Sequence, residues 1–144
     1  MLIPLHELYY SNCSAIPDKP GIYFILAPKD MEIRFLPTAK NPRAPFYKVN
    51  VLQEKYALCK DREILYIGKA SGQKGLKQRL QQYMRYGWNE AVNHKGGRAI
   101  WQIEGAENLL LSYEVCQDPD AKEHALLADY KHINGRYPLA NWRG

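Results

Sequence analysis

Two charged residues of this 144-residue chain stand where a charge is costly unless it has a partner. The first, Arg79, belongs to a basic segment that follows the short apolar run ending at Gly68. On a helix, Arg79 lies about 60° from Leu76, at the edge of an apolar stripe. Its side chain either extends the charge into solvent, which is the commoner case, or faces phosphate oxygens, which its planar fork matches. The spacing predicts the position and leaves both roles open.

The second charged residue is Glu123, near the start of the last predicted helix. At about 100° per residue, Glu123 points into the apolar face of that helix. A carboxylate on such a face must pair with a cation or bind a metal, whereas a Glu near a helix start can also bend out to water. Both alternatives stay open here. The apolar face is predicted to consist of Leu126, Leu127, Tyr130 and Ile133.

Several common catalytic and phosphate-binding motifs are absent from the sequence. The stretch around Gly68 and Lys69 lacks the Ser or Thr and the earlier Gly of a P-loop. The glycines at 68, 72 and 75 do not have the spacing of a dinucleotide-binding fingerprint. The chain also contains no H-E-x-x-H, no paired cysteines with zinc spacing and no G-x-S-x-G elbow.

The apolar pattern predicts a small α/β domain in which helices cover a sheet. We expect a helix over 74–86 and a second one that begins at Pro119, capped by Asp118, and ends at Gly135. The stretch 28–62 contains four prolines, looks inserted, and favours an extension at the sheet edge over a helix. Strands are predicted over 21–27, 63–67, 98–104 and 108–116, with strand-like pieces at 31–36 and 46–52 inside the insertion.

Positive charge is concentrated in two segments of the chain. Residues 28–62 carry eight Lys and Arg against four Asp and Glu, and residues 69–98 carry seven against one. Because the whole chain has a net charge of +5, the remainder is acidic. Segregated positive charge is typical of proteins that neutralise nucleic acid, although a solubilising surface would look the same.

Length and composition indicate one domain, residues 1–144, of a soluble globular protein. No apolar run is long enough to cross a bilayer, and MLIPLHELYY does not resemble a secretion leader. Three distant cysteines, an odd number, are expected to be reduced core thiols. We therefore expect an intracellular, cytoplasmic protein without a membrane partner.

Two triplets, Gly21-Ile22-Tyr23 and Tyr66-Ile67-Gly68, resemble the motifs that give the GIY-YIG nuclease superfamily its name. In that family an arginine follows in the next helix, which matches Arg79. A Tyr or His follows one turn later, which matches Tyr83.

The resemblance continues to the end of the chain. A metal-binding Glu at the start of the last helix matches Glu123, and an Asn that follows a Pro near the C-terminus matches Asn141. All six positions occur in the family's order over residues 21–141. The family usually separates its two motifs by about a hairpin turn, so the insertion at 28–62 is a departure.

The resemblance implies an α+β fold in which helices flank an antiparallel sheet of three core strands, with or without an extension from the insertion. It also implies metal-dependent cleavage of DNA phosphodiesters. Since only one carboxylate is well placed, we expect Glu123 to hold a single Mg²⁺ or Mn²⁺. Arg79 would balance charge in the transition state.

The proton acceptor has two candidates. Tyr23 is the first, with Tyr66 positioning the water and a nearby cation lowering the phenol pKa. Lys69 is the second, or else a phosphate contact. Tyr83 would support the site or contact phosphate, and Asn141 would orient the loop that carries the site or contact DNA.

The basic residues on both sides of Gly68 are the predicted DNA contacts. Gly68 is expected to let the chain turn close to phosphate, in a loop where lysines bind the DNA backbone. Sequence specificity then comes from the insertion, from dimerisation or from a partner protein. The alternative is a nucleic-acid-binding module that does not cleave. The contact candidates are Lys69, Lys74 and Lys77 near the site and Lys40, Arg43 and Lys48 in the insertion.

Overall fold

A four-stranded antiparallel sheet forms the centre of the computed structural model, with strand order β1-β4-β2-β3. The structure describes residues 1–40, 43–90, 94 and 96–142. The antiparallel sheet, together with the helices, confirms the predicted mixed α+β class. The strands are β1 (Ile3–Pro4), β2 (Gly21–Leu26), β3 (Ile64–Ala70) and β4 (Leu110–Val115).

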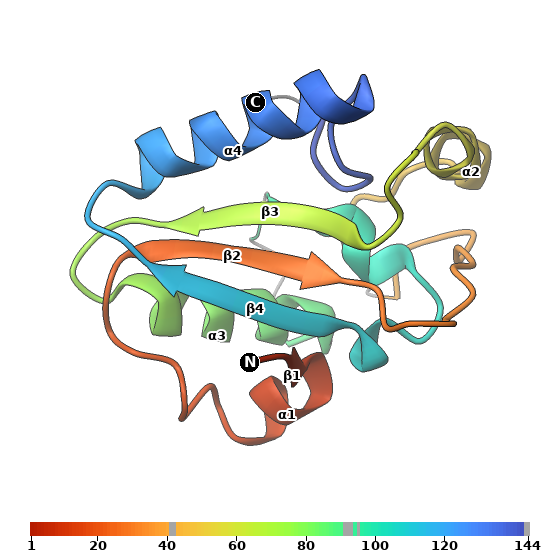
Figure 1. Cartoon of the computed structure of the whole chain (residues 1–144). Coiled ribbons are helices and arrows are strands. Elements are labelled where there is room, and N and C mark those ends of the chain that lie inside the picture. Colours follow the sequence, from red (N-terminus) through yellow and green to blue (C-terminus); the bar gives the residue numbers. More distant parts are fainter. Residues whose placement is uncertain (41–42, 91–93, 95, 143–144) are drawn as a thin grey trace.

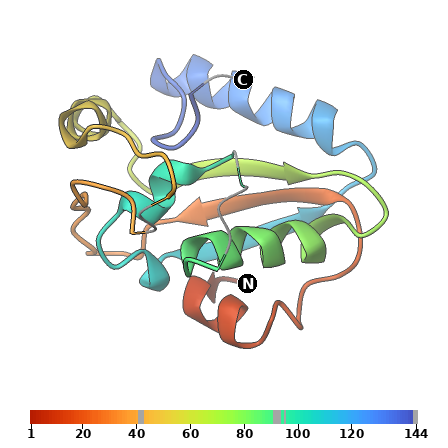
Figure 2. The same cartoon turned by 180° about the vertical axis from the view of Figure 1, so that it is seen from behind.

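Helices cover both faces of this sheet (Figures 1 and 2). One face packs against α3 (Gly75–Gly87) and α1 (Leu5–Tyr10), and the main apolar core lies there. The other face carries α4 (Pro119–Asn134), which contacts β2 and β3. The strand β3 is an edge strand, so its outer side lies between the two helical layers.

The two long helices form where their apolar spacing predicts them. In α3, the predicted stripe of Leu76, Leu80, Tyr83 and Met84 is buried. The α4 helix begins after Asp118, whose side chain accepts a hydrogen bond from the Ala121 N–H at 3.1 Å, and ends at Gly135 in the left-handed conformation. One part of the predicted apolar face is wrong, because Ile133 is 74% exposed near the end of α4.

The strand predicted over 98–104 is a short 3-10 helix, η1 (Arg98–Gln102). Its residues from 99 to 103 are all buried, so the segment shows neither alternation nor helical periodicity. A continuous apolar run of this length does not distinguish a strand from a buried helical turn. A second 3-10 turn, η2 (Ala106–Asn108), connects it to β4.

The insertion contains a helix, which the sequence did not predict. Residues expected to form a strand begin α2 (Val49–Ala57), whose inner side carries the buried Leu52. The prolines precede this helix and do not interrupt it; Pro42 lies outside the described residues. The predicted sheet extension is also wrong, since the fourth strand is β1 and the described part of 28–62 forms a single isolated bridge, Phe35 with Ile103.

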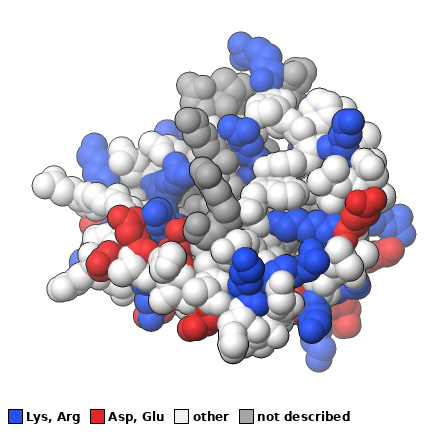
Figure 3. All heavy atoms as spheres, turned by 90° about the horizontal axis from the view of Figure 1, so that it is seen from above, with Lys and Arg blue, Asp and Glu red and all other residues white. Residues whose placement is uncertain are grey.

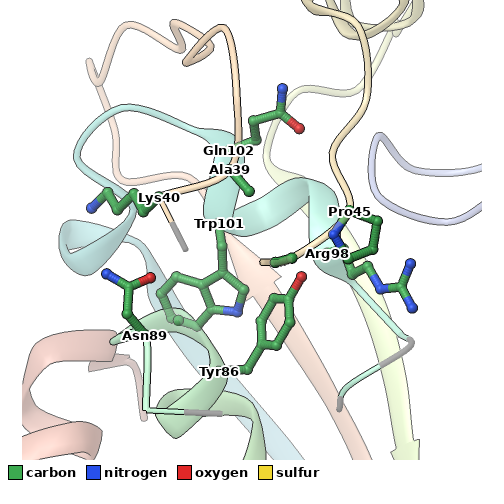
Figure 4. Close-up of a pocket in the computed structure, with 10 residues that line it drawn as sticks. Ala39, Lys40, Pro45, Tyr86, Asn89, Arg98, Trp101 and Gln102 are labelled. Carbon is green, nitrogen blue, oxygen red and sulfur yellow. The ribbon is translucent and has the colours of Figure 1, made fainter. Parts of the chain in front are cut away.

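A buried glutamine fixes the insertion to the rest of the molecule. The Gln102 amide nitrogen donates to the carbonyl oxygens of Leu36 and Tyr47 at 3.0 and 2.7 Å, and its oxygen accepts from the Tyr47 N–H at 3.0 Å. Figure 4 shows the adjoining hollow, where insertion residues meet Trp101 and Tyr86. The insertion is thus a structured part of the domain.

Among the described residues, every helix is too short or too polar to cross a bilayer. All three cysteines are free; Cys13 and Cys59 are buried as expected, whereas Cys116 is only partly buried.

Candidate active site

The pairing of β2 with β3 places two tyrosines on one face of the sheet. Tyr23 lies opposite Gly68, and Ile25 lies opposite Tyr66. Because alternate residues of a strand share a face, both tyrosines face α3, and their ring centroids are 6.0 Å apart. The strand continues to Ala70, so Tyr66 lies within it and not at its end.

Gly68 provides the space that the Tyr23 ring occupies. A Cβ atom at Gly68 would lie 2.4 Å from Cζ of Tyr23, which is far inside van der Waals contact. The expectation that Gly68 forms a turn is therefore wrong, since it lies in β3 across from Tyr23. Its role is the close approach of a ring to the backbone.

A third tyrosine completes a buried cluster. The Tyr83 ring lies 6.1 Å from both Tyr23 and Tyr66, and its hydroxyl donates to the carbonyl oxygen of Gly97 at 2.7 Å. Tyr83 is fully buried, so it is placed to support the site and not to contact a bound phosphate.

Arg79 and Glu123 face the same cleft from the two helical layers. This cleft has a volume of about 460 Å³ and lies along the outer edge of β3, where Tyr66 and Lys69 line it. The Glu123 side chain is 19% exposed, and Arg79 is partly buried. Of the alternatives left open by the sequence, the inward position holds for both residues.

Lys69 neutralises the acidic side of the cleft. Its Nζ lies 2.8 Å from Oδ1 of Asp120 and 3.7 Å from Oε1 of Glu123. The hydrogen bond to Asp120 raises the pKa of Lys69 and lowers the pKa of Asp120. Lys69 is therefore protonated at neutral pH. Asp120 was missed by the sequence analysis, although it lies one turn before Glu123.

Burial dominates the ionisation of the tyrosines. It raises the pKa of Tyr23, and the nearby Arg79 guanidinium only partly offsets this. Burial raises the pKa of Tyr66 and of Tyr83 well above the usual range. The lowered phenol pKa that a general base requires is thus not present in the protein alone. Tyr23 is completely buried, and its hydroxyl has no hydrogen-bond partner within the described residues, whereas Tyr66 reaches the cleft.

Glu123 is the best-placed metal ligand of the cleft. Burial raises its pKa, and Lys69 opposes this rise. The described residues contain no group of three or more His, Cys, Asp or Glu side chains that could hold a metal. Mg²⁺ binds proteins through one or two carboxylates while it keeps several waters. The donor set therefore fits a single hydrated Mg²⁺ or Mn²⁺ and does not fit a two-metal centre.

The side chain of Asn141 is hydrogen-bonded to the backbone of β3. Its side-chain oxygen accepts from the Ile67 N–H, and its side-chain nitrogen donates to the Ile67 carbonyl, both at 2.9 Å. The side chain is buried. Of its two expected roles, orienting the site fits this geometry, because the buried amide is held by the backbone of β3 and is not presented to solvent.

The segment that contains Gly96 and Gly97 borders the cleft and was not predicted to do so. A Cβ at Gly96 would lie 2.7 Å from the Tyr66 hydroxyl, and Gly97 has a φ of +66°. His94 stacks on Tyr83 at 4.7 Å and is buried, which lowers the pKa of its imidazole to about 4. The adjacent glycines in the sequence were the available signal for this close approach.

The six predicted DNA contacts divide into two groups. Lys69 lines the cleft, and Lys74 and Lys77 lie at the start of α3 beside it. The insertion residues are elsewhere: Lys40 borders the hollow of Figure 4 and lies 3.8 Å from Glu107, and Lys48 is exposed before α2. Arg43 is also exposed. Figure 3, which views the molecule from the side where α4 lies in Figure 1, shows Lys and Arg side chains spread over this side, with Asp and Glu side chains among them.

Comparison with known proteins adds no further assignment: no family model, curated protein or solved structure matches the chain.

Proposed function

We propose that the protein is a metal-dependent endonuclease of the GIY-YIG type that hydrolyses DNA phosphodiester bonds. The observation that supports this most strongly is convergence at one cleft. Tyr66, Lys69, Arg79 and Glu123 come from three different elements and line it together. A phosphodiester requires positive charge on one side and a metal ligand on the other, and the cleft offers both.

Glu123 would hold the metal ion, which supplies Lewis-acid stabilisation of phosphate charge when bound. Lys69 now occupies the space between Asp120 and Glu123, so its ammonium takes up part of the carboxylate charge in the protein alone. Lys69 would compete with a bound divalent cation for the carboxylate of Glu123. Asp120 is positioned to retain its ion pair with Lys69 when Glu123 binds the metal instead.

Arg79 would bind the non-bridging oxygens of the scissile phosphate. It is partly buried beside three tyrosines, so its charge is less screened than that of a surface arginine. Its planar group can donate two parallel hydrogen bonds to a phosphate. Arg79 therefore stabilises the charge that develops during in-line attack.

Tyr66 would position the attacking water, because its hydroxyl lies next to Gly96 at the wall of the cleft. Tyr23 remains the candidate base of the proposal; it is completely buried, and Tyr66 and Arg79, which line the cleft, lie beside it. Burial raises the pKa of both phenols. That pKa must fall before either tyrosine can be present as a phenolate that accepts a proton at neutral pH. Positive charge delivered by the metal and Arg79 acts in that direction.

A nucleic-acid-binding module without catalysis is the second candidate. The observation that favours it is the ionisation state of the site, where both candidate bases, Tyr23 and Lys69, hold their protons at neutral pH. Incubation with supercoiled plasmid distinguishes the two functions. Nicked or linear product that requires Mg²⁺ or Mn²⁺ supports the nuclease, whereas a shifted but intact plasmid at all metal concentrations supports the binding module.

A further inference from the structure

The strand that carries Tyr66 is held at its outer edge by the C-terminal segment. Among the described hydrogen bonds, the Ala140 N–H donates to the Leu65 carbonyl at 2.8 Å, and the Asn141 amide makes the two bonds to Ile67 given above. These bonds join the residues immediately before and after Tyr66. The position of Tyr66 in the cleft therefore depends on where the C-terminal segment lies.

The insertion in turn holds that segment through α2. Lys55 donates a hydrogen bond to the carbonyl oxygen of Asn141. Its ammonium also lies 3.9 Å from the centroid of the Trp142 ring, and the same ring stacks on Tyr47 at 4.8 Å. Three contacts from the insertion thus involve the consecutive residues Asn141 and Trp142. Asn141 is in turn hydrogen-bonded to β3.

Lys55 makes this contact without an acidic partner. The described residues include no ion pair of Lys55 with Asp or Glu, and the titratable groups that act on it are Cys59, just after α2, and Arg136, just after α4. A half-buried ammonium of this kind is unfavourable for folding unless it binds something specific. Here it binds a carbonyl oxygen and an aromatic face, which are both suited to a cation.

We propose that Lys55 is a positioning residue, which acts through Asn141 to hold the β3 edge and hence Tyr66 in the cleft. The inference rests on the proposed function, since Tyr66 is the group being positioned. It assigns the insertion a role in the chemistry that is independent of DNA contact. The charge on Lys55 is needed for the full strength of both contacts.

The test measures the position of the β3 edge in the free protein. The Ile67 amide proton, which Asn141 binds, reports whether the segment is in place, and its hydrogen-exchange protection factor can be followed by NMR between pH 6.5 and 9. Burial lowers the pKa of Lys55 to about 8, so its charge is lost within this range. In the wild-type protein, protection of Ile67 is expected to fall as the pH rises through about 8.

Three variants make the result specific. Lys55→Met should exchange at Ile67 about tenfold faster than the wild type at pH 6.5, with no further loss on raising the pH, because a hydrogen bond from a charged donor has been removed. Lys55→Arg keeps its charge and should retain protection at pH 9. Lys60→Met, which removes an exposed lysine just after the same helix, should behave as the wild type does.

Either of two results would overturn the proposal. One is Ile67 protection in Lys55→Met that equals the wild type at pH 6.5. The other is a pH-dependent fall in Lys55→Arg that matches the wild type. If plasmid cleavage is detectable, Lys55→Met should also lower kcat while leaving KM for DNA unchanged. A wild-type protein that does not cleave DNA would refute the proposed nuclease and leave the exchange experiment to decide whether Lys55 holds the strand.

Discussion

Glu123 shows how the cleft keeps a costly charge at the residue scale. Its carboxylate is largely buried, its pKa is raised by that burial, and Lys69 supplies only a 3.7 Å contact in compensation. A carboxylate in such a position lowers the stability of the fold at neutral pH. Retaining it is understandable if it binds a cation that the isolated chain lacks.

Glu123→Gln should therefore raise the free energy of unfolding while it removes cleavage. A raised folded-state pKa means that the folded protein binds the proton more tightly than the unfolded chain. Stability is then lost as the pH rises through that pKa. Relief of such a site commonly stabilises a protein by about 0.5–2 kcal/mol. Urea titrations of both proteins at pH 4 and pH 7 measure this difference in unfolding free energy. A variant less stable than the wild type at pH 7 would contradict the conclusion that the Glu123 carboxylate destabilises the fold.

Arg79→Ala and Tyr23→Phe should each lower the cleavage rate by about two orders of magnitude or more, as expected when a charge partner or a base is lost. Tyr66→Phe belongs in the same series because Tyr66, unlike Tyr23, lines the cleft. Single-turnover rates at saturating DNA separate the chemical step from binding. Normal cleavage by Tyr23→Phe together with loss in a Lys69 variant would transfer the base assignment to Lys69.

At the scale of elements, the site depends on the register of β2 and β3. Gly68→Ala should destabilise the protein by about 1–3 kcal/mol, the usual cost of overpacking, because the new methyl group meets the Tyr23 ring. In a Tyr23→Ala background the ring is absent, so the same substitution should cost much less. A double-mutant cycle of unfolding free energies measures the difference. Equal costs in the two backgrounds would show that the close contact is not responsible.

Elements with helical spacing or clear boundary residues were the ones that the sequence predicted well. The helices α3 and α4 show an apolar stripe or a capping residue, whereas β2 and β3 are apolar runs, buried almost throughout, that lie next to Pro or Gly. The strand predicted over 98–104, where the 3-10 helix η1 forms, was wrong because a continuously buried apolar run fits a helical turn as well as a strand. The helix α2 was not predicted because Val49 and Val51 suggested a strand. In the structure Leu52 is buried, and the side chains one turn further along the helix are partly buried.

In the candidate site, helical spacing indicated some residues, whereas those that depend on tertiary contacts were missed. Arg79 and Glu123 stand out on helical wheels, and in the structure both line one cleft. Gly96 was not predicted because its place beside Tyr66 depends on tertiary contacts. Nor could sequence spacing indicate that burial would raise the tyrosine pKa values.

At the scale of the whole molecule, positive charge lies on the cleft side and also on the insertion. If Lys40, Arg43 and Lys48 contact phosphates, neutralising all three should weaken DNA binding and flatten its salt dependence. Each contact contributes about 0.9 to the log–log slope on duplex DNA. Lys40 is already close to Glu107, so its share is expected to be smaller than that of the exposed Lys48. Affinity measured from low to moderate salt decides this, and an unchanged slope would show that the insertion does not bind DNA through these residues.

The neutralised insertion also provides a control for the site. Turnover at saturating DNA should change little in this triple variant, because Glu123, Arg79 and the tyrosines are untouched. A large loss of turnover with normal binding would instead place part of the reaction on the insertion.

The central claim is that Glu123 supports metal-dependent cleavage of DNA, and one paired measurement tests it most directly. Wild type, Glu123→Ala and the matched control Asp129→Ala, an exposed carboxylate on the same helix, are compared for plasmid nicking with and without Mg²⁺ and for DNA affinity in parallel. The account predicts Mg²⁺-dependent nicking by the wild type and the control, and none by Glu123→Ala, with similar DNA affinity for all three. Metal-dependent nicking by Glu123→Ala at the wild-type rate would contradict it.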